Sequence, residues 1–287
     1  SIAAHERGRG FVRGILGACE ETTTGVVRLK AMERQRRLKF PVIAVNDALT
    51  KFLFDSRYGT GQSGLEGIMR ATNLLLAGRN VVIAGFGWVG RGVALRAKGM
   101  GSMVIVTEVN AVRALEALME GFEVMPMDEA AKVGDLFITA TGCIDIITGA
   151  HMLRMRDKAI LCNVGHYNVE VSVKELERLA VRKKQVRAEV TEYTLKDGKR
   201  LYLLSEGRLV NLAAADGHPA EVMDMSFADQ ALSAEFLTRR SGGLVTKVIP
   251  VPEEIDMEVA RKRLQAFGRR IDKPTPAQKK YLQSWQF

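Results

Sequence analysis

Between residues 80 and 165, short apolar runs alternate with helix-like segments, and this alternation restricts the fold more than any other feature of the chain. The apolar runs are VVIA (81–84), MVIVTE (103–108), LFITATG (136–142) and AILCNVG (159–165). Continuous apolar runs of this length are typical of strands that are buried on both faces of a parallel sheet. We therefore expect an α/β protein with a Rossmann-type, doubly wound parallel sheet.

A glycine-rich loop follows the first of these strands. Gly85, Gly87 and Gly90 form the pattern G-x-G-x-x-G, and a helix is predicted directly after it, over 89–100. The first glycine permits a tight turn, the second permits close approach of a pyrophosphate, and the third lets the helix pack on the strand. The N-terminus of that helix would face the phosphates. The loop predicts a dinucleotide site, and an ordinary α/β turn is the alternative.

The second strand ends at Glu108, eighteen residues after Gly90. A carboxylate about 20 residues after the glycine loop is expected to bind the ribose 2′-hydroxyl of NAD. Its charge would repel the 2′-phosphate of NADP, whereas Arg91 and Arg113 could hold such a phosphate. The sequence favours NAD, and it leaves NADP open.

Other segments are predicted on both sides of the alternating region. We expect a helix over 61–77, with Leu65, Ile68, Met69 and Leu75 near one stripe, and a hairpin near 186–206 that turns at Asp197-Gly198. A long helix beginning near Pro219 and two closing helices follow. The resulting division is 1–60 as a remnant of a substrate-binding domain, 61–215 as an NAD-binding domain, and 216–287 as C-terminal helices that return to the substrate domain and to oligomer contacts.

The composition excludes several classes of protein. The chain has 287 residues, of which 47% are hydrophobic and 26% are charged, and no apolar run approaches the roughly 20 residues of a membrane helix. Its only cysteines are Cys19, Cys143 and Cys162, which have no metal-ligand spacing, so we expect no metal site and a cytoplasmic location. The net charge of +9 is spread over helix-like segments, and we expect no nucleic-acid partner.

Several polar groups carry both a structural and a functional interpretation. The run ETTTG (21–25) could cap a helix or form a turn. Lys51 and Asp55 would share one helix face at i, i+4, where a surface salt bridge is the alternative to a catalytic pair. His166 follows a strand at the edge where α/β sheets bind ligands. Asn211 and His218 could be helix caps or cofactor contacts.

A set of segments connects these groups. EETTTG, VNDALTKFLFD, RYG, GFGWVGRG, VTEVN, ATGCIDI, CNVGHYNVE and EGRLVNLAAADGHP occur in this order between residues 20 and 219. Together they resemble the adenosylhomocysteinase (S-adenosyl-L-homocysteine hydrolase) family. The resemblance implies reversible hydrolysis of S-adenosylhomocysteine to adenosine and homocysteine, with NAD used catalytically. It implies oxidation of the ribose 3′-hydroxyl, removal of the C4′ hydrogen, loss of homocysteine from C5′, addition of water and final reduction.

The resemblance also implies roles for individual residues. Glu21 would bind the substrate ribose, Lys51 and Asp55 would act at its 3′-hydroxyl and in proton transfer, and His166 would lie beside the 3′ oxygen and the nicotinamide. The implied cofactor-binding residues are Thr22, Thr23, Thr24, Ser56, Gly85, Gly87, Trp88, Val89, Gly90, Glu108, Arg113, Val164, Gly165, His166, Asn211 and His218. A homo-oligomer is the expected assembly.

The chain also departs from the family pattern. Members of the family carry a long substrate-domain segment before EETTTG, whereas the motif begins here at Glu20. Ser56 stands where many members have Asn, Thr60 replaces a cysteine of some members, and Arg113 replaces a polar cofactor contact. Two alternatives stay open from the sequence. One is a truncated or non-catalytic NAD-binding homologue that regulates a partner or oligomerises with it, and the other is an NAD-dependent 2-hydroxyacid dehydrogenase.

Overall fold

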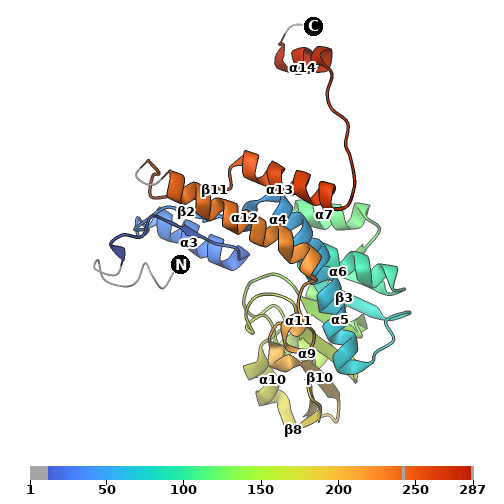
Figure 1. Cartoon of the computed structure of the whole chain (residues 1–287). Coiled ribbons are helices and arrows are strands. Elements are labelled where there is room, and N and C mark those ends of the chain that lie inside the picture. Colours follow the sequence, from blue (N-terminus) through green and yellow to red (C-terminus); the bar gives the residue numbers. More distant parts are fainter. Residues whose placement is uncertain (1–11, 241–242, 286–287) are drawn as a thin grey trace.

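The computed structural model describes residues 12–240 and 243–285. Two sheets organise this part of the chain, one of eight strands and one of three. Figure 1 shows the larger sheet with its helices below, and above it two groups of helices, α3–α4 in blue and α12–α13 in orange and red. The polypeptide passes from the small sheet to the large one through η2 and α5, and it returns through the start of α12.

The large sheet has the order β5-β4-β3-β6-β7-β10-β9-β8, and its first six strands are parallel. This order confirms the expected Rossmann-type sheet. Its strands are β3 (Asn80–Ala84), β4 (Met103–Thr107), β5 (Glu123–Val124), β6 (Leu136–Thr139), β7 (Ala159–Asn163), β8 (Ala180–Arg187), β9 (Val190–Leu195) and β10 (Arg200–Leu204).

Side chains of this sheet alternate between two cores, as the twofold period of a strand requires. Along β3, Val81 and Ile83 face the core beneath α5 and α6, whereas Val82 faces the core beneath α8 and α9. Both faces of the sheet are therefore covered. The helices of this part are α5 (Thr60–Thr72), α6 (Trp88–Gly99), α7 (Ala111–Met119), α8 (Met127–Val133), α9 (Gly149–Arg154), α10 (Val173–Leu179), α11 (Val210–Ala213) and the short η3 (Ser205–Gly207).

The small sheet has the order β1-β2-β11, and all its pairings are parallel. Two small apolar cores surround it, which contain Leu29, Phe40 and Val42 on one side and Ile43, Val45 and Leu237 on the other. The elements of this part are β1 (Ala18–Cys19), α3 (Thr23–Arg34), β2 (Val42–Ala44), η1 (Val45–Asp47), α4 (Leu49–Lys51), η2 (Phe52–Gly59), α12 (Ala220–Arg239), β11 (Val248–Pro250) and α13 (Glu253–Ala266). Helix α14 (Pro276–Gln283) follows α13 along the chain.

In the part around the large sheet, one predicted helix was too long and one strand was not predicted. The helix predicted over 61–77 ends at Thr72, because Asn73 adopts a left-handed conformation (φ 56°, ψ 34°) and Leu74 N–H turns to the Thr72 hydroxyl. Leu75 is therefore not on the buried helical stripe, and it is 73% exposed. Strand β8 was missed, since its run of Arg and Lys side chains lacks the apolar alternation of a strand.

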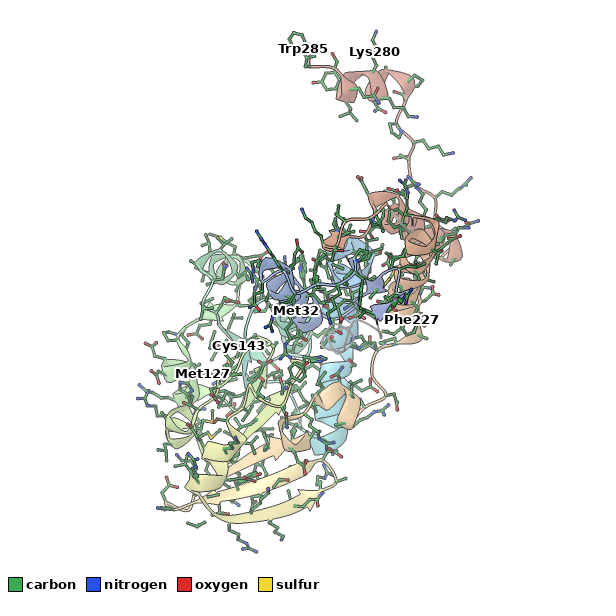
Figure 2. All side chains as sticks on the ribbon, turned by 90° about the vertical axis from the view of Figure 1, so that its left-hand side faces the viewer. Met32, Met127, Cys143, Phe227, Lys280 and Trp285 are labelled. Atoms are coloured by element: carbon green, nitrogen blue, oxygen red, sulfur yellow. The ribbon has the colours of Figure 1, made fainter. Side chains whose placement is uncertain are left out.

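The predicted hairpin is confirmed. β9 and β10 pair antiparallel, and the connection turns at Asp197 and Gly198, where Gly198 has φ +86°. Figures 1 and 2 both show α14 standing clear of the rest of the molecule, and in Figure 2 the side chains of Lys280 and Trp285 lie on this isolated helix and just beyond it. Among the described residues, none of the helices combines the length and apolarity needed to cross a membrane.

Candidate active site

The glycine loop after β3 contains glycines of two kinds. Gly85 has φ +94°, and a Cβ on Gly90 would lie 1.9 Å from the Gly85 carbonyl oxygen, so the fold itself requires glycine at both positions. A Cβ on Gly87 would meet only the Arg113 guanidinium, at 3.7 Å. The protein leaves this space open at the N-terminus of α6, which is where a pyrophosphate would approach the backbone.

Glu108 ties the glycine loop to the end of β4. Its Oε2 accepts the Phe86 N–H at 2.7 Å, and its Oε1 accepts the N–H groups of Val109 and Asn110 at 2.7 and 2.9 Å. Burial alone would raise the pKa of Glu108, but these donors and the nearby Arg113 hold it below its ordinary value. An ionised carboxylate directly after the second strand of a Rossmann-type sheet favours NAD over NADP.

Arg91 already has acidic partners within the protein. Its guanidinium pairs with Glu116 at 2.7 Å and also with Glu120, and it lies over the Trp88 ring. These ion pairs compete with the role of Arg91 as a holder of a 2′-phosphate. Trp88 packs against Phe52 of η2, with ring centroids 5.3 Å apart, and this contact joins the start of α6 to the substrate side of the site.

On that side, Lys51 and Asp55 form a buried ion pair. Lys51 Nζ lies 3.2 Å from Asp55 Oδ1, and the two side chains are 7% and 10% exposed. The surface salt bridge considered from the spacing is therefore wrong. The pair spans the junction of α4 with η2, a π-helical segment, and such widened turns frequently occur at functional sites. Two charges are desolvated here at a cost that packing alone would not demand.

Asn46 completes the surroundings of Lys51, although it is not among the residues predicted from the sequence. Its Oδ1 accepts from Lys51 Nζ at 3.3 Å and from the Thr23 hydroxyl at 3.0 Å. Asn46 follows β2 as Glu20 follows β1, at the carboxyl ends of parallel strands. A buried polar residue directly after VIAV in VIAVND was the signal that could have identified it.

His218 lies against the other side of Asp55. Its Nε2 is 3.5 Å from Asp55 Oδ1 and 3.2 Å from the Thr60 hydroxyl, and its Nδ1 is 3.1 Å from the Ser63 hydroxyl. Burial raises the pKa of Asp55, but the neighbouring His218 and Lys51 lower it by more, so the pKa lies below its ordinary value and the carboxylate is ionised. The structure thus places His218 beside the predicted proton-transfer pair.

Helix α12 supplies three further polar contacts that sequence reasoning missed. Ser226 Oγ donates to Asp55 Oδ2 at 3.3 Å, and the Gln230 amide donates to Glu21 Oε2. The pKa of Glu21 is raised by burial, with the charges of Asp55 and Glu20 adding to the effect and Lys51 opposing it. These residues lie on a long helix some 200 positions from Glu21, and their spacing on α12 offered no recognisable motif.

Asp229 is the third of these residues. It is fully buried, and its Oδ2 lies 2.8 Å from the Thr50 hydroxyl. Asp256 lies against the same hydroxyl and accepts from the N–H groups of Leu49 and Thr50. The single proton of the hydroxyl can serve one of the two carboxylates at a time. Burial raises the pKa of Asp229 to about 7, and the charges of Asp256 and Glu21 add to this rise. The two carboxylates hold the start of α4, and with it Lys51.

The threonine run forms the first turn of α3. The expectation of a helix N-terminus is confirmed, with Thr22 at the N-cap, but hydroxyl capping is not, because Thr22 makes no side-chain cap hydrogen bond. Thr24 Cγ2 would lie 3.6 Å from a Cβ on Gly142, and Arg28 lies over the Tyr167 ring at 5.1 Å. The start of α3 therefore contacts the loops that follow β6 and β7.

The loop after β7 contains Val164, Gly165 and His166. Asn163 holds its backbone, since its Oδ1 accepts Gly165 N–H at 2.8 Å and its amide donates to the carbonyls of Gly165 and Tyr167. His166 is exposed, and its ring lies edge-on to Tyr167 with centroids 4.3 Å apart. Within residues 12–240 and 243–285, no hydrogen bond joins His166 to Lys51 or Asp55.

Among the buried polar side-chain atoms that have no partner in the described part of the chain are the Thr24 hydroxyl and the Asn211 Oδ1. Both belong to the predicted cofactor set, and a buried polar atom without a partner is costly unless a ligand or water satisfies it. Together with the open space at Gly87, they fit a bound dinucleotide. Ser56, another predicted cofactor contact, is buried in η2.

The parallel sheet, the glycine loop and the ionised carboxylate after β4 define a Rossmann-type, NAD-binding protein. Residues 56–217 match the family model described as S-adenosyl-L-homocysteine hydrolase, NAD binding domain. The chain belongs to the adenosylhomocysteinase family, and this membership agrees with the resemblance that the motifs indicate.

Relatives from other organisms support the same family membership. The chain is 60% identical to adenosylhomocysteinase from Aquifex aeolicus over 98% of its own length and 68% of the relative. It is 58% identical to S-inosyl-L-homocysteine hydrolase from Methanocaldococcus jannaschii, with the same coverage of both chains. It therefore spans about two thirds of these relatives. Dipicolinate synthase A chain from Bacillus subtilis shares the fold, with a TM-score of 0.52 and 13% identity over 78% of this chain and 65% of that one.

Proposed function

We propose that this chain acts in the reversible hydrolysis of S-adenosyl-L-homocysteine to adenosine and L-homocysteine. The observation that carries the proposal is the buried Lys51–Asp55 pair beside the NAD-binding loop, in a member of a family of hydrolases. A 2-hydroxyacid dehydrogenase has no need for this pair, and its net oxidation would consume NAD. Family membership therefore removes that alternative.

The residues of the site are suited to moving protons at a ribose. Asp55 is ionised, and Lys51 is positioned by both Asp55 and Asn46, so the pair can accept and return the proton of the 3′-hydroxyl. Glu21 presents a half-buried carboxyl group to the same region and is suited to bind ribose hydroxyls. His218 supports Asp55 from the opposite side.

The cofactor would be held by the open backbone at Gly87, by Glu108 and by the unpartnered atoms of Thr24 and Asn211. When bound, NAD⁺ accepts a hydride from the substrate and returns it at the end of the cycle. The chain contributes position and charge: α3 contacts the loops after β6 and β7, and these contacts would hold the two sides of the site together around the cofactor.

Two purine bases are candidates for the substrate, adenine and hypoxanthine. One relative at 58% identity is named S-inosyl-L-homocysteine hydrolase, so hypoxanthine in place of adenine is a candidate with the same ribose chemistry. The contacts described above all concern the ribose and the cofactor. We propose the adenosine compound as the substrate because the relatives at 60% identity carry that name.

The first experiment is to incubate the purified, NAD-loaded protein with S-adenosylhomocysteine or S-inosylhomocysteine and to measure free thiol and NADH. Thiol release without net NADH supports the hydrolase, and the faster substrate identifies the purine. A folded, NAD-loaded protein that releases no thiol from either compound would instead support the non-catalytic NAD-binding alternative.

We also propose a homo-oligomer in a reducing, cytoplasmic compartment, and the division of the chain at residues 60 and 215. The exposed apolar side chains of α7 favour association, and they include Val112, Leu115, Leu118 and Met119. All three cysteines are free, which suits a reducing compartment. Light scattering on the purified protein tests the oligomer.

A further inference from the structure

The surroundings of His218 determine where its ring carries a proton. The ring lies between two sets of partners: Asp55 and Thr60 face Nε2, and Ser63 faces Nδ1. Ser63 is fully buried on α5, two turns after Asp55 along the same chain segment. Within the described part of the chain, its hydroxyl lies at hydrogen-bond distance from two groups, the His218 ring and the Gly59 carbonyl.

The single proton of the Ser63 hydroxyl determines which atom donates in the hydrogen bond between Ser63 and His218. The hydroxyl has one proton, and it lies 2.9 Å from the Gly59 carbonyl oxygen, which can only accept. With that proton used, the oxygen of Ser63 can only accept from Nδ1, at 3.1 Å. The imidazole Nδ1 must then carry a hydrogen whether the ring is neutral or charged.

We infer that Ser63 is a positioning residue that holds the proton of His218 on Nδ1, so that Nε2 is the nitrogen that gains or loses a proton beside Asp55. Nε2 then accepts from the Thr60 hydroxyl when the ring is neutral and donates toward Asp55 when it is charged. The proton that exchanges is the one directed at the Lys51–Asp55 pair. The consequence for turnover rests on the proposed function, whereas the proton assignment does not.

The backbone at Gly59 makes this arrangement possible. A Cβ at Gly59 would lie 2.9 Å from His218 Cδ2, so only glycine lets the ring reach Ser63 and Asp55 together. Gly59 therefore serves twice, through its absent side chain and through the carbonyl that takes the Ser63 proton. The charged groups around the ring are Asp55, Lys51 and Glu21, and none of them contacts Nδ1.

The test is the tautomer of His218, read by nitrogen NMR of the NAD-loaded protein labelled at histidine. A His218→Asn variant identifies the signal. In the wild-type protein, at a pH where the ring is neutral, we expect Nδ1 protonated and Nε2 unprotonated. Ser63→Ala removes the acceptor, and more than half of the neutral ring is expected to change to the Nε2–H form. Ser63→Thr, which keeps a hydroxyl, should retain the original form.

Ser102→Ala is the matched control, because Ser102 is also a buried serine that donates to a backbone carbonyl at 2.9 Å, that of Leu76, outside the site. It should leave the His218 signal unchanged. An Nε2–H tautomer in the wild-type protein overturns the inference, even if Ser63→Ala does not fold. A Ser63→Ala protein that keeps the Nδ1–H form overturns it as well.

Turnover gives a second readout. If the hydrolase is active, Ser63→Ala should lower kcat by about 10-fold with little change in KM, since the binding groups stay in place. Ser63→Thr should restore most of it. An inactive wild-type protein with the Nδ1–H tautomer would remove the proposed function and leave the assignment at Ser63 standing.

Discussion

The cofactor side and the substrate side of the site are built in different ways. The glycine-loop part of the cofactor side is local: β3, its glycine loop and α6 are consecutive, and Glu108 follows directly after the next strand. The substrate side is assembled from distant parts of the chain. The single residue Asp55 contacts three partners: Lys51, which is close in sequence, His218 in the loop before α12, and Ser226 in α12.

The two sides also differ in what holds them. Apolar packing and glycine backbone geometry shape the cofactor loop, whereas buried charges and hydroxyls shape the substrate side. A site that is defined by backbone geometry tolerates changes of neighbouring side chains. It is disrupted when a side chain is added at one of its glycines. A buried polar network fails when one partner is removed, because the others are left without a charge or hydrogen bond.

The largest effect is expected at Lys51. Lys51→Met should lower kcat by about 10³-fold, because the proton-transfer pair is lost, and lower the free energy of unfolding by about 3 kcal/mol, because the Asp55 charge stays buried. Thiol-release kinetics and urea unfolding measure the two. Lys30→Met is the control: its ion pair with Asp47 is exposed, and it should change stability by less than about 0.5 kcal/mol. Equal losses in both variants would contradict the distinction between the two sites.

On the cofactor side, two glycines of one loop should respond differently. Gly90→Ala should lower the free energy of unfolding by about 3 kcal/mol, since its Cβ would meet the Gly85 carbonyl oxygen. Gly87 has ordinary backbone angles (φ −71°), so Gly87→Ala should leave stability nearly unchanged and raise the Kd for NAD⁺ by about 100-fold. Calorimetry and thermal unfolding separate the two results. A Gly87→Ala protein that binds NAD⁺ normally would show that no ligand approaches there.

The same contrast explains what the sequence could predict. The large sheet, its glycine loop and Glu108 were predictable because strand period and motif spacing are properties of neighbouring residues. Helix 61–77 was predicted too long because a left-handed Asn73 leaves no mark in the apolar period. Strand β8 was missed because its side chains are exposed and basic.

The substrate side was predictable only where the family motifs cover it. Lys51, Asp55 and Glu21 were selected by resemblance, and spacing alone suggested a surface salt bridge at Lys51. Asn46, Ser226 and Asp229 were missed, because a polar residue that is buried by distant segments looks in sequence like a polar residue on a surface. Only the tertiary structure reveals which of them lose water.

Asp229 offers a test of this burial through pH. Because its pKa is raised to about 7 from an ordinary 3.8, the native state binds this proton more tightly than the unfolded chain. The stability from this group is fully present below about pH 4 and is lost as pH rises through 7, at up to about 1.4 kcal/mol per pH unit. Asp229→Asn removes this loss, and at pH 8 the variant should be more stable by about 2 kcal/mol.

Urea unfolding between pH 5 and pH 8 measures the difference. Asp224→Asn is the control, since Asp224 lies on the same helix, is 68% exposed and pairs only loosely with Arg263 at 3.5 Å. Its stability should follow the wild-type protein across the range. If the stability of the wild-type protein and that of Asp229→Asn depend on pH to the same extent, Asp229 is solvated. Water would then reach more of the substrate side than the contacts indicate.

The smallest effect is expected at Glu108. Glu108→Gln keeps the size of the side chain but removes the charge that repels a 2′-phosphate, and it leaves Arg113 without its carboxylate neighbour. The ratio of the Kd values for NADP⁺ and NAD⁺ should fall by about 10-fold, or roughly 1.4 kcal/mol. Adding Arg113→Gln should abolish the gain, because Arg113 is the cation closest to the open space at Gly87. If the double variant binds NADP⁺ as well as Glu108→Gln does, the preference lies in loop shape and not in charge, and the cofactor side is more purely a backbone site than these contacts suggest.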